Sequence, residues 1–160
     1  MVGGTYYHVE CELIIQNTGT VNDVVIFGEQ GVDVKTGTTL VNEVVVGANF
    51  VQLRGGVTLN AALPLPAIIS GGGGVQADAN VTVFGAIYTE GEADFNPINL
   101  HGPLISLGGV EIQGGSGTLY TDDHTTDPNY LRYYAIMPGF TYPAEQLTGV
   151  IQPGSWRELQ

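Results

Sequence analysis

The sequence predicts an all-β protein: a right-handed parallel β-solenoid (β-helix) of about five turns, followed by an irregular aromatic C-terminal tail. Three observations lead to this prediction. Residues 24–41 and residues 43–60 align without gaps at an offset of 19. Two closer copies, offset by 17 residues, carry the chain to Tyr120. Before Asp127, apolar residues nowhere recur at helical spacing over three turns, and many of the 24 glycines separate short alternating segments.

The first pair of repeats indicates what each turn contains. The matching segments are Gly28 with Gly47, residues 32–34 with residues 51–53, and residues 37–40 with residues 56–59. Three short strands joined by glycine corners, within about 20 residues, are typical of a β-solenoid. Glycine suits the corners because the backbone there takes positive φ without a Cβ clash. One such unit cannot form a core alone, so it must stack on its neighbours.

The predicted solenoid covers residues 24–120, with one interruption. Residues 61–66 (AALPLP) contain two prolines, which cannot donate to a strand ladder, so we expect an excursion from one corner there. The repeat resumes at Ile68, and its closest copies begin at Gly85 and Gly102. The solenoid, the N-terminal residues 1–23 and the C-terminal residues 121–160 are expected to make one domain, which the length of 160 residues also indicates.

Residues 1–23 are predicted to form an N-terminal strand that caps the solenoid. From Tyr6 to Ile15 the chain alternates at period two, which is typical of a half-buried strand. Tyr7, Val9, Cys11 and Leu13 fall on one face of this strand, and Tyr6, His8, Glu10 and Glu12 fall on the other. Cys11 is therefore expected to point inward as a small apolar residue.

Residues 121–160 are predicted to form a capping tail, since they show no repeat and hold many prolines and tyrosines. One short helix is expected at residues 127–132, with Asp127 as its cap and Pro128 at its first position. A solenoid must cover its open ends, or it polymerises. The single tryptophan, Trp156, followed by Arg157 and Glu158, is expected to anchor the tail on the solenoid.

Charge and cysteine content narrow the classes of function. The chain has 16 acidic and 4 basic residues, a net charge of −12, which repels nucleic-acid phosphates and anionic lipid headgroups. With one cysteine, there is no intramolecular disulfide. No apolar segment is long enough to span a membrane, and Met1 to Ile15 does not resemble a signal peptide. An exported protein would carry its targeting segment outside this chain.

Two clusters were weighed as sites of chemistry. Asp122, Asp123 and His124 place two carboxylates beside an imidazole, but adjacent residues in a strand point to opposite faces, which favours a polar loop. Glu90, Glu92 and Asp94 alternate and so share a face, which makes them weak candidates for binding a divalent cation; a solvated acidic stripe is the simpler interpretation. We therefore expect no catalytic residues, no cofactor and no enzyme activity.

The repeats and the closing segment resemble a known family. The string VTVFGAIYTEGEADF, then GPLISLGGVEIQGG, an aspartate-rich link and the final PGSWREL are similar to the C-terminal region of PilX-like type IV pilus-assembly proteins. The resemblance covers about residues 24–160, and its most specific part is Trp156-Arg157-Glu158. Bactofilin-like polymer-forming solenoids share the repeats more distantly. The resemblance implies an exported cell-surface protein with no catalytic residues. This chain departs from the family in lacking the hydrophobic pilin-like helix at its start.

The sequence therefore predicts a structural or adhesive cell-surface module, associated with a type IV pilus-like assembly. Its expected partners are other proteins, or further copies of itself, bound through the ends or faces of the solenoid. One alternative is a subunit of a viral or phage particle, or of a self-assembling extracellular filament. A carbohydrate-active β-helix enzyme is the third possibility.

Overall fold

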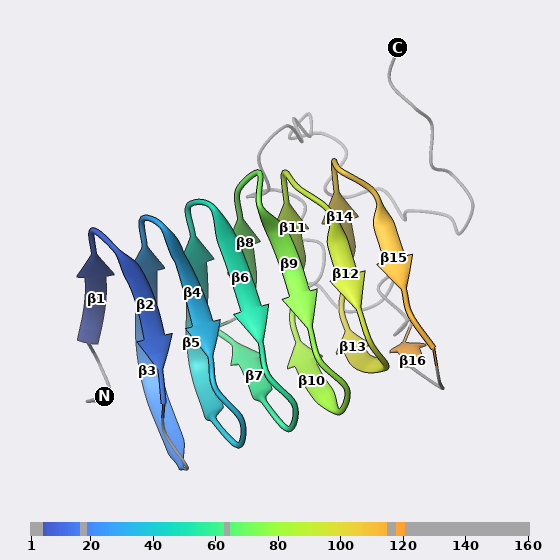
Figure 1. Ribbon diagram of the computed structural model, residues 1–160. Coiled ribbons are helices and arrows are strands. Elements are labelled where there is room, and N and C mark those ends of the chain that lie inside the picture. Colours follow the sequence, from blue (N-terminus) through green and yellow to red (C-terminus); the bar gives the residue numbers. More distant parts are fainter. Residues whose placement is uncertain (1–4, 17–18, 63–64, 115–117, 121–160) are drawn as a thin grey trace, which may run out of the picture.

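The computed structural model describes residues 5–16, 19–62, 65–114 and 118–120, and these form stacked coils of parallel strands (Figure 1). All sixteen regular elements among these residues are strands, and every strand pair is parallel. The predicted all-β solenoid of about five turns is confirmed. The coil carries three strand positions, and each position recurs on every coil along the stack.

The strands fall into three rows. The first row is β1 (Thr5–Val9), the second half of β3 (Thr20–Gly28), the second half of β5 (Thr39–Gly47), β8 (Ile68–Ser70), β11 (Ile87–Thr89) and β14 (Leu104–Ser106). The second row is β2 (Glu12–Ile15), β4 (Gly31–Val34), β6 (Phe50–Leu53), β9 (Gly74–Ala77), β12 (Ala93–Phe95) and β15 (Val110–Ile112). The third row is the first halves of β3 and β5, then β7 (Thr58–Ala61), β10 (Val81–Phe84), β13 (Ile98–His101) and β16 (Thr118–Tyr120).

The second row is a six-stranded sheet, and the other two rows form one ten-stranded sheet that turns a corner within β3 and β5. At that corner Asp23 and Asn42 have φ of 56° and 53°, in the left-handed region. Asp and Asn enter this region more readily than other residues with a Cβ, because their short polar side chains bond locally. Asn42 Nδ2 donates to Asp23 Oδ1 at 3.0 Å, so the two corners are also joined to each other.

The strand register reproduces the sequence repeats. Gly28 pairs with Gly47 at the offset of 19, and Ile87 pairs with Leu104 at the offset of 17. The excursion also lies where the prolines predict it, since β7 ends at Ala61 and β8 begins at Ile68. The first half of β5 pairs with β7, which precedes this excursion, and the second half of β5 pairs with β8, which follows it.

The core lies inside the coils and is built from alternate residues of each strand. Inward side chains such as Val51, Leu53 and Leu59 are fully buried. Each such aliphatic side chain contributes about 1.5–3 kcal/mol relative to an exposed one. Stacking in register places apolar residues above one another, so adjacent coils cover each other's cores.

The N-terminal segment differs from its prediction. It is not one strand from Tyr6 to Ile15 but two, β1 and β2, separated by a corner at Glu10 and Cys11. Both strands pair in parallel with the next coil, so the stack begins before residue 24. Cys11 is exposed at the corner, and the prediction that it points inward is wrong. Tyr7 and Leu13 do pack against the core.

The tail predictions fall outside the described residues. These are the helix at residues 127–132, the cluster Asp122, Asp123 and His124, and the anchor Trp156, Arg157 and Glu158. Within the described part of the chain, no helix has the length and apolar character needed to cross a membrane.

Candidate functional site

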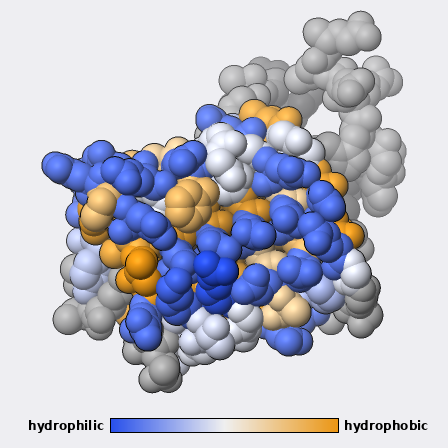
Figure 2. Space-filling model, in the orientation of Figure 1, coloured by the Kyte–Doolittle hydropathy of each residue, from blue (hydrophilic) through white to orange (hydrophobic). Residues whose placement is uncertain are grey.

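The outer surface of the six-stranded sheet carries the most organised set of polar side chains. Because its strands are in register, the outward residue at the centre of each strand lies beside its counterpart on the next coil. We call this row the middle column; it consists of Ile14, Asp33, Gln52, Gln76, Asp94 and Glu111. Seen from this side, hydrophilic residues cover much of the sheet, with smaller hydrophobic patches between them (Figure 2).

Asp33 is the centre of an ion-pair cluster in this column. Its side chain is 5% exposed, and it accepts hydrogen bonds from Lys35 Nζ and from Arg54 on the next coil. The two Arg54 contacts, from Nε and from one terminal nitrogen, are each 3.3 Å long and engage both carboxylate oxygens. Lys35 and Arg54 are the only lysine and arginine among the described residues, and both of them bond to Asp33.

The cluster fixes the ionisation of Asp33. Burial by itself would raise the pKa of this carboxyl, but the hydrogen bonds from Lys35 and Arg54 and their positive charges outweigh burial and lower it. The hydrogen bond with Asp33 in turn raises the pKa of Arg54. A carboxylate held this way accepts two charge-assisted partners and joins two adjacent coils.

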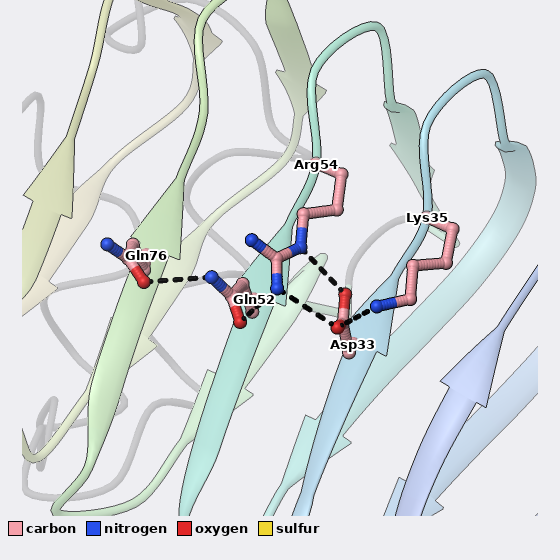
Figure 3. Close-up of polar contacts among 5 residues, drawn as sticks. All are labelled: Asp33, Lys35, Gln52, Arg54 and Gln76. Atoms are coloured by element: carbon pink, nitrogen blue, oxygen red, sulfur yellow. Dashed lines mark hydrogen bonds and ion pairs between the residues drawn. The ribbon is translucent and has the colours of Figure 1, made fainter.

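A chain of side-chain amides extends from this cluster along the middle column (Figure 3). Arg54 donates to Gln52 Oε1 at 2.9 Å, and Gln52 Nε2 donates to Gln76 Oε1 at 2.9 Å. Both hydrogen bonds run in one direction, from Arg54 toward β9. Farther along, Gln113 Nε2 donates to Asp94 Oδ1 at 3.1 Å, which links the next two coils.

The structure separates the predicted metal ligands. Glu90 lies at the corner after β11, Glu92 lies just before β12, and Asp94 is the central residue of β12, where its Oδ1 accepts a hydrogen bond from Gln113. Within residues 5–16, 19–62, 65–114 and 118–120, no group of three or more His, Cys, Asp and Glu side chains is placed to hold a metal ion. The two described histidines have other contacts: His8 forms a hydrogen bond with Glu29 at 2.9 Å, and the ring of His101 stacks on Phe84.

Sequence reasoning missed the buried carboxyl of Glu43. This side chain is fully buried, and neither of its oxygens has a hydrogen-bond partner. Burial raises the pKa of Glu43 well above its ordinary value, because the charged form loses its hydration. The repeat alignment held the signal, since Glu43 matches the apolar Val24 at the offset of 19.

Comparison with known proteins gave no matching family model, no matching curated protein and no matching solved structure.

Proposed function

We propose that this protein is a non-catalytic structural or adhesive module of the cell surface, associated with a type IV pilus-like assembly. One observation carries the proposal. The polar side chains on the six-stranded sheet are bonded to one another from coil to coil, through Asp33–Arg54, Gln52–Gln76 and Asp94–Gln113. Side chains used in this way stiffen a regularly spaced surface, which suits recognition by a partner more than it suits turnover.

Two further features support the proposal. The net charge of −12 keeps such a surface away from nucleic acid and anionic lipid, leaving proteins and glycans as partners. The resemblance to PilX-like proteins, which is most specific at Trp156-Arg157-Glu158, points to a pilus-related assembly.

Labelling of intact cells tests this proposal. Antibodies raised against the purified full chain, visualised by gold particles on cells of the native host, are expected to decorate the cell surface and its appendages. A strain in which the gene is deleted provides the background. Labelling confined to the cell interior, or to released particles, contradicts the proposal and favours a viral or phage subunit.

A second candidate, a self-assembling filament subunit, is favoured by the last described coil. Val110 and Ile112 are 50% and 49% exposed, whereas Ala93 and Phe95, their partners on the preceding coil, are fully buried. Strand β15 is also an edge of the six-stranded sheet, and such edges are templates for further pairing. Light scattering of the full chain at rising protein concentration tests this candidate; a particle mass that stays monomeric rules it out.

A further inference from the structure

A small hollow lies on the six-stranded sheet, beside the end of the amide chain. Its volume is about 280 Å³, and it is lined by Phe50, Val51, Gln52, Gly73, Gly74 and Gln76, from β6, β9 and the corner before β9. Small-molecule sites usually have volumes of about 300–1,000 Å³, so this hollow suits a single ring-sized group.

Two glycines on either side of Phe50 shape the hollow. On one side the aromatic ring lies across Gly31, where an added Cβ would come within 2.4 Å of a ring carbon. On the other side Phe50 pairs with Gly74 of the next strand. Gly74 has φ of +84°, and a Cβ there would approach the Glu92 carbonyl oxygen to 2.2 Å. Glycine is therefore required at this position of the hollow's lining.

The polar edge of the hollow is the carboxamide of Gln76. Its Oε1 already accepts a hydrogen bond from Gln52, while its Nε2 has no partner among the described residues. This Nε2 is the last donor of the chain that begins at Arg54 and passes through Gln52, and donors aligned in one direction polarise one another. The hollow thus offers an aromatic ring beside a free, polarised N–H donor.

We propose that this hollow, built by Phe50, Gly74 and Gln76, binds one sugar ring of a glycan. A pyranose ring has a face of C–H groups that packs on an aromatic ring, and a rim of oxygens that accept hydrogen bonds. The ring packs against Phe50, and a hydroxyl or carboxylate oxygen accepts the hydrogen of Gln76 Nε2. This inference rests on the proposed adhesive role and specifies the class of ligand that the surface takes.

Other ligands fit this place less well. A peptide that binds as an added strand needs a free sheet edge, but β6 and β9 are paired on both sides. Nucleic acid is repelled by the acidic chain. The charges of Lys35 and Arg54 are already opposed by Asp33, Glu12 and Asp78, so the sugar ring itself is the expected contact.

Titration of the isotope-labelled full chain, followed by amide NMR signals, tests the proposal with two probes: cellohexaose, which is neutral, and hexagalacturonate, which is anionic. One or both are expected to shift the side-chain amide signal of Gln76, with a Kd on the order of 1 mM, as suits a small open site. A shift with hexagalacturonate alone assigns the site to acidic glycans, and a shift with both assigns it to the sugar ring itself.

Three variants locate the binding. Phe50→Ala and Gln76→Ala are each expected to weaken binding about tenfold, which corresponds to about 1.4 kcal/mol. Phe84→Ala is the matched control, because Phe84 is a 41% exposed ring on the other sheet, and it is expected to bind as the wild type does. The exposed Gln76 tests the site even if Phe50→Ala fails to fold.

The proposal is overturned if neither glycan shifts the Gln76 amide at about ten times the expected Kd. It is equally overturned if Phe84→Ala weakens binding as much as Phe50→Ala, or if Gln76→Ala binds unchanged. Absence of glycan binding together with surface labelling would remove this inference and leave the proposed function standing. Labelling confined to the cell interior would remove the proposed function whatever the titration gives.

Discussion

Glu43 occupies, on its coil, the inward position that Val24 occupies on the coil before it. The two residues are paired in the register of β3 and β5, and Ala61 follows on the next coil. Val24 and Ala61 belong to the apolar core, whereas Glu43 brings a carboxyl there and gives it no hydrogen-bond partner. A buried polar group without a partner costs about 1–3 kcal/mol. This position is therefore a point of low stability in an otherwise regular stack.

Replacing Glu43 by valine should stabilise the protein. The Glu43→Val variant restores the residue of the preceding coil and removes the unpaired carboxyl, so we expect the free energy of unfolding to rise by about 1–3 kcal/mol. Urea unfolding of the full chain measures this change. Glu111→Gln, at an exposed position, is the control and should change stability by less than about 0.5 kcal/mol. A lower urea midpoint for Glu43→Val would contradict the assignment.

The free energy of unfolding should also fall as pH rises from 4.5 to the raised pKa of Glu43 in the folded protein. Its pKa in the folded protein is raised above the ordinary value of 4.5, so the folded state binds more protons than the unfolded state in this window. The contribution of Glu43 to stability is fully present below pH 4.5, and is lost as pH rises through the folded-state pKa. Thermal midpoints measured upward from pH 4.5 should decline less in Glu43→Gln than in the wild type.

A control separates this effect from general charge repulsion. Glu111→Gln removes the same charge from an exposed position, so its thermal midpoint should follow the wild-type pH dependence. Titration of Asp33 does not contribute to the change in thermal midpoint above pH 4.5. Its pKa is lowered from 3.8, so its contribution is lost only as pH falls below that value. Parallel pH profiles for the wild type and Glu43→Gln would show that Glu43 does not titrate as we infer.

Asp33→Asn should destabilise the protein by about 1–2 kcal/mol, because it removes the charge that holds Lys35 and Arg54 across two coils. The loss is limited because Lys35 and Arg54 are each about a third exposed, and water screens part of the attraction. Denaturant unfolding of a double-mutant cycle with Arg54→Gln measures the pair. Strictly additive changes would mean that Asp33 and Arg54 do not interact energetically.

Alanine should destabilise the protein at Gly71 but leave its stability almost unchanged at the neighbouring Gly72. A Cβ at Gly71 would lie 1.9 Å from the carbonyl oxygen of Ala48, whereas a Cβ at Gly72 would meet nothing within 4 Å. We expect Gly71→Ala to cost about 1–3 kcal/mol through the backbone shift it forces, and Gly72→Ala to stay within about 0.5 kcal/mol of the wild type. Thermal unfolding compares the two variants, and equal midpoints would contradict the close approach of the coils at Gly71.

The N-terminal corner shows why part of the fold escaped prediction. In the second coil Gly28 and Gly31 flank the corner, but the first coil has Val9 and Glu12 at these positions, so no glycine marks it. The corner also keeps the alternation in phase, because the inward Val9 and Leu13 are four residues apart. Periodicity alone therefore could not distinguish one long strand from two strands joined by a corner.

The cluster around Asp33 was within reach of the sequence. Arg54 follows Asp33 by 21 residues, which is one coil of 19 plus two. This spacing places Arg54 just after β6, on the same outer surface as Asp33 in the adjacent strand β4. The hollow beside Phe50 could not be predicted from the sequence. It depends on the ring lying over Gly31, and periodicity does not specify side-chain direction of this kind.

The coil can be read from the sequence, since parallel stacking in register turns a constant offset of 19 or 17 directly into strand pairing, as Gly28–Gly47 and Ile87–Leu104 show. The excursion before Ile68 can be read from the sequence as well, because proline cannot join a ladder. Which polar groups are paired and which are buried alone depends on how the coils pack. Asp33 and Glu43 are both carboxylates on β-strands, yet one faces outward toward two cations and the other faces inward among apolar side chains. Burial and partners belong to the packed coils, and these two terms set the charge and the stability of each group.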